Sequence, residues 1–67
     1  MSSYKDLLRL IKELPLGYRT VFNLYAIEGY NHKEIAQMLG ITEGSSKSQL
    51  SRARQALQQK LIKENTI

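Results

Sequence analysis

Residues 31–57 read NHKEIAQMLGITEGSSKSQLSRARQAL and contain two helix patterns that are separated by too few residues to lie in line. Asn31 can cap a helix, and Glu34 can complete a capping box by reaching back to the exposed backbone N–H of Asn31. Apolar residues recur at the spacing of one helical face until Gly40, where a left-handed residue would end the helix. The pattern predicts a helix over 32–39, about two turns long.

A second helix follows almost at once. Ile41 is an apolar residue in the connection, and Thr42 can cap a helix that begins at Glu43, whose charge favours the positive end of the helix dipole. A connection of this length with a glycine is typical of a helix-turn-helix. A short αα-hairpin in a helical bundle could have the same capping residues and glycine. The second helix is predicted over 43–62, and the residues on its outer face distinguish a helix-turn-helix from such a hairpin.

That outer face is polar and has no acid. With Leu50 as the reference and 100° per residue, the core side of the helix contains Ala53, Leu57 and Leu61. The opposite side contains short hydroxyls, amides and a cation: Ser45, Ser48, Arg52, Gln55 and Gln59. Lys47 and Ser51 lie on one flank, and Gln49 and Lys60 on the other. These are side chains that reach base edges and phosphates in a major groove.

The charge distribution favours the same reading. Residues 1–43 contain five basic and five acidic residues, whereas residues 44–67 contain five basic residues and one glutamate. The whole net charge of +4 therefore belongs to the last helix. A helix of one sign repels itself unless a polyanion is its partner.

The amino-terminal half of the chain predicts two packing helices, over 3–13 and 16–28. Pro15 ends the first, because the residue before a proline avoids helical angles, and Gly29 ends the second. Tyr25 and Tyr30 are expected in the core rather than as stacking platforms for single strands. The fold class is therefore all-α, a four-helix domain with a carboxy-terminal helix-turn-helix, over residues 1–67.

Composition excludes several functions. With 67 residues and no cysteine, the chain forms one small domain without disulfides or thiolate metal sites, which fits a reducing cytoplasm. No segment resembles a signal peptide or reaches the ~20 apolar residues of a membrane span. His32 is the only histidine, and no carboxylates cluster with it in the sequence. We therefore expect the chain to bind no metal or cofactor and to have no enzymatic activity. His32 itself is expected near solvent, with a minor chance of touching a phosphate beside Lys33.

Residues 14–61 resemble region four, the carboxy-terminal promoter-reading domain of extracytoplasmic-function sigma factors of bacterial RNA polymerase. The most specific matches are Leu14-Pro15, Glu34-Ile35-Ala36 and the LSRAR of residues 50–54. Ser45 and Ser46 replace the usual Thr and Val, so that Ser46 is expected to weaken a buried contact. Gln49 replaces a frequent Arg.

The resemblance implies which residues meet DNA. The matching positions are Lys47, Ser48, Gln49, Ser51 and Arg52, with Arg52 the strongest candidate for a base or a neighbouring phosphate. Ser45, Thr42 and Lys33 are expected to hold phosphates. Arg54 projects only about 40° from the core centre, so we expect it to pair with an acid such as Glu34 and to be a weaker DNA candidate.

The resemblance also implies partners: the promoter minus-35 element, core polymerase through its beta-subunit flap, and an anti-sigma factor. The region-two half of a sigma factor is absent, so the chain is expected to be a fragment of a cytoplasmic protein. Two alternatives stay open at this point. One is a LuxR-type helix-turn-helix output domain of a response regulator, and the other is a basic bundle that binds an acidic protein.

Overall fold

A computed structural model describes residues 4–65, with the side chains of residues 4–63. The elements are α1 (Tyr4–Lys12), α2 (Leu16–Phe22), the π-helical turn η1 (Asn23–Ile27), α3 (His32–Leu39) and α4 (Glu43–Asn65). No strand occurs among the described residues, and the predicted all-α class is confirmed. The four helices were predicted close to their observed bounds. Residue 3 lies outside the described part of the chain, and α4 extends to Asn65 rather than ending at 62.

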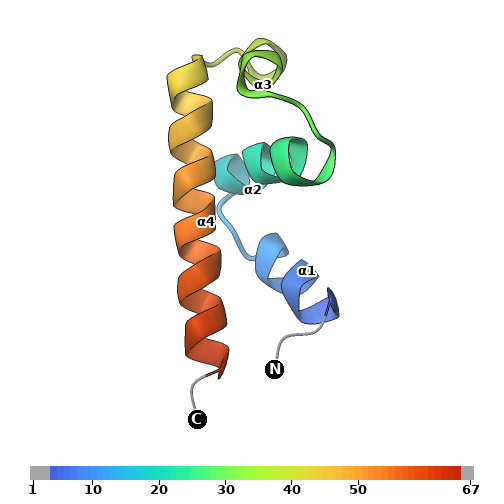
Figure 1. Cartoon of the computed structure of the whole chain (residues 1–67), viewed down its shortest axis with the longest axis vertical. Coiled ribbons are helices and arrows are strands. Elements are labelled where there is room, and N and C mark those ends of the chain that lie inside the picture. Colours follow the sequence, from blue (N-terminus) through green and yellow to red (C-terminus); the bar gives the residue numbers. More distant parts are fainter. Residues whose placement is uncertain (1–3, 66–67) are drawn as a thin grey trace.

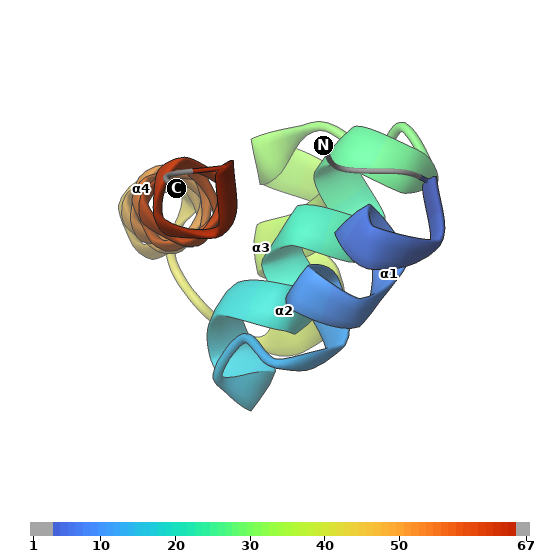
Figure 2. The ribbon, with the colours of Figure 1, turned by 90° about the horizontal axis from the view of Figure 1, so that it is seen from below.

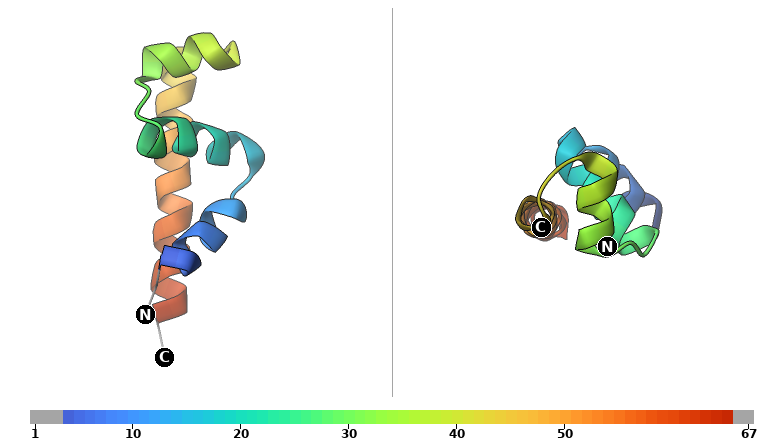
Figure 3. Two further views of the ribbon diagram at one scale, coloured as in Figure 1. Left: turned by 90° about the vertical axis from the view of Figure 1, so that its right-hand side faces the viewer. Right: turned by 90° about the horizontal axis from the view of Figure 1, so that it is seen from above.

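The long helix α4 forms one side of the molecule, and α3, α2 and α1 cross it in turn from its amino-terminal to its carboxy-terminal end (Figure 1). Seen from below, these three helices all lie on the same side of α4 (Figure 2). The side view shows α3 crossing α4 close to its first turns (Figure 3). One face of α4 is therefore covered along much of its length, while the opposite face is open.

Apolar side chains form two clusters along the covered face of α4. The first joins α1 to the middle of α4 through Leu10, Ile11, Leu14, Ala53 and Leu57. The second joins α2 and α3 to the first half of α4 through Val21, Ile35 and Leu50. Phe22 packs against both clusters and so connects them. Tyr25 and Tyr30 pack against the second cluster, as predicted.

The ends of α3 have the predicted geometry. The Asn31 side-chain oxygen accepts from the Glu34 N–H at 2.8 Å, and the Glu34 carboxylate accepts from the Asn31 N–H at 3.0 Å. Gly40 ends the helix with φ 68°, a left-handed angle that glycine adopts without a Cβ penalty. Thr42 Oγ1 then accepts from the Ser45 N–H at 3.0 Å at the start of α4. Local capping thus specifies the short connection of the helix-turn-helix.

The second predicted helix differs in detail, because its last part is a π-helical turn. The Glu28 N–H donates to the Asn23 carbonyl, five residues earlier, at 3.0 Å. This wider turn is followed by Gly29 with φ 84°. Arg19 is not free at the surface, because its guanidinium donates to the Lys12 carbonyl at 2.9 Å and so binds the end of α1. No helix among the described residues has the length and apolarity to cross a membrane.

Candidate nucleic-acid interface

The open face of α4 carries the exposed polar residues that the sequence predicted. Ser46, Leu50, Ala53 and Leu57 point into the bundle and are buried. Lys47, Ser48, Ser51 and Arg52 are exposed. Within the described part of the chain, neither Lys47 nor Arg52 forms an ion pair with an acid. Their positive charges are therefore available to an external anion, and the long side chains are free to adapt to it.

Ser45 and Gln49 lie on the flank of α4 that faces α2. Both are half-buried, and the Gln49 amide donates to Ser45 Oγ at 3.0 Å. The Gln49 side chain also covers Gly17, since a Cβ at that glycine would lie 2.8 Å from Gln49 Oε1. The structure thus places these two residues beside, rather than on, the fully exposed face. One N–H of the Gln49 amide is bonded to Ser45, so a contact with DNA would use its second N–H or its oxygen.

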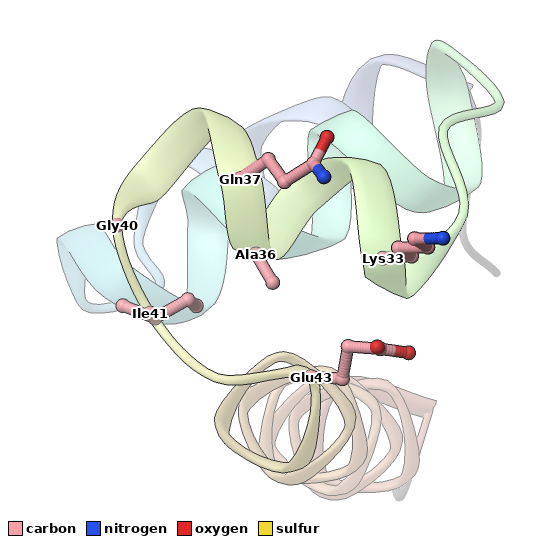
Figure 4. A pocket seen from close by; sticks show the side chains of 6 residues that line it. All are labelled: Lys33, Ala36, Gln37, Gly40, Ile41 and Glu43. Carbon is pink, nitrogen blue, oxygen red and sulfur yellow. The ribbon is translucent and has the colours of Figure 1, made fainter.

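Lys33 and Thr42 lie near the contact between α3 and the start of α4, the two helices of the motif. A crevice of about 370 Å³ separates α3 from the start of α4 and is lined by Lys33, Ala36, Gln37, Gly40, Ile41 and Glu43 (Figure 4). Figure 4 shows Lys33 and Glu43 extending toward the same mouth of this crevice. Lys33 is exposed, whereas Thr42 Oγ1 already accepts a hydrogen bond from the Ser45 backbone. Thr42 can still donate its hydroxyl hydrogen to a phosphate.

Arg54 does not pair with Glu34, so this part of the prediction was wrong. The Arg54 guanidinium carbon lies 5.8 Å from the centre of the Tyr25 ring, a cation–π contact. The Glu34 carboxylate instead accepts from the Asn31 N–H. The sequence analysis predicted that Glu34 takes part in the capping box but did not predict the contact between Arg54 and Tyr25.

The environment of His32 differs from the expectation that its side chain lies near solvent. It is half-buried, its Nδ1 lies 2.8 Å from Ser46 Oγ, and its ring stacks on Tyr25 with centres 4.5 Å apart and planes 18° apart. Ser46 is fully buried, so this hydrogen bond satisfies a hydroxyl that would otherwise be costly to bury. The polar pair therefore replaces an apolar contact. One signal was present, because Ser46 precedes Leu50 by four residues and so lies on the core side of the helix.

Among the residues that the structure describes, no group of three His, Cys, Asp or Glu side chains could hold a metal ion. The arrangement of exposed cations, hydroxyls and amides along an uncovered helix suits the binding of an extended polyanion.

Comparison with known proteins adds a family. A family model described as "Sigma-70, region 4" matches residues 4–57. A curated relative, the "ECF RNA polymerase sigma factor SigM" of Bacillus subtilis (strain 168), is 43% identical over 47 residues. These residues make up 70% of this chain and 29% of the relative, so the chain spans less than a third of that protein's length. No solved structure matches the chain significantly.

Proposed function

Since the chain belongs to the sigma-70 region 4 family, as a region 4 domain of the extracytoplasmic-function type, we propose that it binds double-stranded promoter DNA at the minus-35 element. In this role it directs RNA polymerase to start transcription. The match to a region 4 model favours this function over a LuxR-type output domain. The function would place the protein in the bacterial cytoplasm, where the chromosome and the polymerase are.

The observation that carries the proposal is the uncovered face of α4. Its exposed residues include Lys47, Ser48 and Arg52, and the three other helices lie on the opposite side (Figure 2). In helix-turn-helix proteins the second helix enters the major groove with its amino-terminal part. The amino-terminal end of α4 extends past α2 to the level of α3 (Figure 3), and its uncovered face can be reached by a duplex.

The proposal assigns different roles to the residues around this face. Arg52 is the first candidate for direct base reading, because its planar guanidinium can donate two hydrogen bonds to guanine. Lys47, Ser48 and Ser51 surround it on the same face. Lys33, Thr42 and Ser45 are proposed to hold phosphates, while Gln49 and Arg54 are weaker candidates because both have partners within the protein.

We also propose that core RNA polymerase binds the domain through its beta-subunit flap and that an anti-sigma factor can mask it. Membership of the family supports core RNA polymerase as a partner. A protein contact is also supported by the apolar groove of about 380 Å³ between α1 and the end of α2 with η1. Its lining includes Leu7, Ile11, Phe22 and Ile27, and Ile27 is largely exposed. The groove lies on the bundle side of α4, so the polymerase and DNA could bind together.

Salt dependence of DNA binding tests the proposal. A labelled duplex that carries a minus-35 element, selected from a randomised library by the 67-residue chain, would be titrated by fluorescence anisotropy at several salt concentrations. With four or five phosphate contacts, we expect a slope of about −4 when the logarithm of the association constant is plotted against the logarithm of the salt concentration. Binding that is absent at low salt would refute DNA binding and favour the basic protein-interaction bundle.

Matched charge variants identify the face that binds. Lys47→Gln with Arg52→Gln removes two exposed cations from α4, and we expect the slope to fall by roughly 2 if both meet phosphates. Lys5→Gln with Lys12→Gln removes two exposed cations from α1 and should leave the slope nearly unchanged. Equal effects of the two changes would contradict the assignment of the face.

A further inference from the structure

His32 and Ser46 form a polar contact between the two helices of the motif. The distance from His32 Nδ1 to Ser46 Oγ is 2.8 Å, and Ser46 is 0% exposed. In the described part of the chain, this nitrogen is the one hydrogen-bond partner of the Ser46 side chain. The Thr42 carbonyl, one turn earlier on the helix, accepts from the Ser46 backbone N–H at 3.0 Å. The buried hydroxyl therefore depends on His32.

The direction of this hydrogen bond follows from the donors and acceptors available. A serine hydroxyl has one hydrogen to donate, and a neutral imidazole has one nitrogen that accepts. The hydroxyl hydrogen is satisfied when Ser46 donates to Nδ1 and the ring carries its own hydrogen on Nε2. A protonated imidazole has N–H groups on both nitrogens. Protonation of His32 would thus turn Nδ1 into a donor and remove it as the acceptor of the Ser46 hydroxyl hydrogen, which would have to turn to the Thr42 carbonyl one helical turn back.

Several charged groups lie around the neutral ring. The His32 ring stacks on Tyr25, and the Arg54 guanidinium of α4 lies over that same tyrosine. Lys33 is adjacent on α3, and Lys47 follows Ser46 on α4. Of the neighbouring acids, Glu34 is hydrogen-bonded to the Asn31 N–H, and Glu43 lies beside Lys33 at the crevice between α3 and α4. A charged ring would therefore join three nearby cations.

The contact lies where it can control how α4 is presented to DNA. Ser46 points inward one residue before Lys47 and two residues before Ser48, which are both exposed. Successive residues are about 100° apart around a helix. Holding Ser46 against His32 consequently sets the rotation of the turn that carries Lys47 and Ser48. Arg54, two turns further along α4, contacts the same stack through Tyr25.

We propose that His32 is a positioning residue for DNA recognition: the neutral ring, stacked on Tyr25, holds Ser46 and thereby fixes the orientation of the reading end of α4, so that specific DNA binding weakens when His32 is protonated. This inference rests on the proposed function. The His32–Ser46 contact between α3 and α4 would thus respond to protonation, whereas the apolar contact that Val at position 46 would make would not.

The test uses the 67-residue chain, which has a single histidine, and compares DNA binding at pH 7.5 and pH 5.5. Anisotropy would measure affinity for the library-selected duplex and for a scrambled duplex of equal composition, at one ionic strength. From pH 7.5 to 5.5 we expect the selected duplex to lose roughly tenfold in affinity. The scrambled duplex should lose none, because added positive charge favours non-specific binding.

Two variants serve as controls. The double change His32→Phe and Ser46→Val keeps a ring on Tyr25 but removes both the hydroxyl and the titrating group. His32→Asn keeps an acceptor near Ser46 without a group that titrates in this range, and covers the case in which the double variant folds poorly. Both variants should bind the selected duplex with the same affinity at the two pH values.

The outcomes separate this inference from the proposed function. No binding of any duplex by the unaltered chain at pH 7.5 would refute both. If the affinity for the selected duplex does not change with pH, or if the variants lose affinity at pH 5.5 as the unaltered chain does, the role of His32 is refuted and the proposed function is not. Global unfolding of the unaltered chain at pH 5.5, seen as loss of helical circular dichroism, would overturn the inference, and His32 would be a stability residue if the two variants stay folded at that pH.

Discussion

Two arginines that are two residues apart on α4 have different environments. Arg52 is on the open face with no acidic partner in the described part of the chain. Arg54 lies over the Tyr25 ring, which limits the positions that its guanidinium can take. An arginine that meets a base or a phosphate gains most when it is not already engaged. Substitution of Arg52 should therefore affect DNA affinity more than stability, and substitution of Arg54 should affect stability more than DNA affinity.

Alanine substitution at each arginine tests this difference. Arg52→Ala should weaken binding of the selected duplex by about 1–3 kcal/mol if the guanidinium meets guanine. Its effect on stability should stay within about 0.5 kcal/mol, as for other surface changes. Arg54→Ala should cost about 0.5–1 kcal/mol of stability through the lost cation–π contact and should reduce affinity less.

Anisotropy and urea unfolding would be measured on both proteins, with Gln58→Ala as an exposed residue of α4 for comparison. The assignment fails if Arg54→Ala loses DNA affinity without loss of stability while Arg52→Ala has no effect.

At the scale of the elements, the motif depends on how α3 ends. Gly40 adopts φ 68°, and the Ile41 N–H that follows donates to the Ala36 carbonyl at 3.0 Å. A residue with a Cβ is strained at such an angle whatever space surrounds it. Gly44, in the first turn of α4, has no positive φ, and a Cβ there would meet only Thr42 Oγ1 at an ordinary 3.8 Å. The two glycines therefore differ in conformation rather than in packing.

The same substitution at both glycines should have opposite effects. Gly40→Ala should destabilise the domain by about 1–2 kcal/mol, the usual cost of left-handed angles for other residues. Gly44→Ala should stabilise it by about 0.5–1 kcal/mol, since alanine loses less freedom on joining a helix. Urea unfolding followed by circular dichroism measures both. Shifts of the same sign would show that the left-handed end of α3 does not limit the stability of the motif.

At the scale of the whole molecule, the carboxy-terminal part of α4 is held to α1 partly by charge. Glu13 accepts from Lys60 at 3.2 Å and also pairs with Arg9 at 3.3 Å. The hydrogen bond from Lys60 is the main cause that lowers the pKa of Glu13 from its usual 4.5, helped by the charges of Lys60 and Arg9 and opposed by desolvation. Leu57 and Ala53 provide the apolar part of the same contact.

This contact predicts a stability difference that depends on pH. Because the pKa of Glu13 is lower in the folded chain than in the unfolded chain, its contribution is present above the unfolded value and is lost as the pH falls through the folded value. Glu13→Gln should therefore be less stable than the unaltered chain at pH 7, and the difference should shrink as the pH falls below about 4.5. Urea unfolding of both proteins from pH 7 to 3 measures this.

High salt provides the control for the same pair. At about 0.5 M salt the difference at pH 7 should become smaller, since exposed ion pairs are screened. A difference that persists unchanged at pH 3 would show that Glu13 acts through packing instead of charge.

The amino-acid sequence determined by itself the features that depend on neighbours along the chain. The capping box of Asn31 and Glu34, the left-handed Gly40 and the stop at Pro15 all concern backbone groups within a few residues of each other. The face of α4 that is buried could also be predicted, because helical periodicity places Leu50, Ala53 and Leu57 on one side. These local rules were sufficient for the fold class and for the direction in which Arg52 points.

Only the tertiary structure decided which polar side chains meet across helices. His32 and Ser46 are 14 residues apart, and Arg54 and Tyr25 are 29 apart, and no spacing rule brings either pair together. Their contacts depend on the angle at which α3 and η1 cross α4, and that angle results from packing around Val21, Ile35 and Leu50. Long-range partners are set by the whole core, so the environments of His32, Gln49 and Arg54 became known only when the helices were assembled.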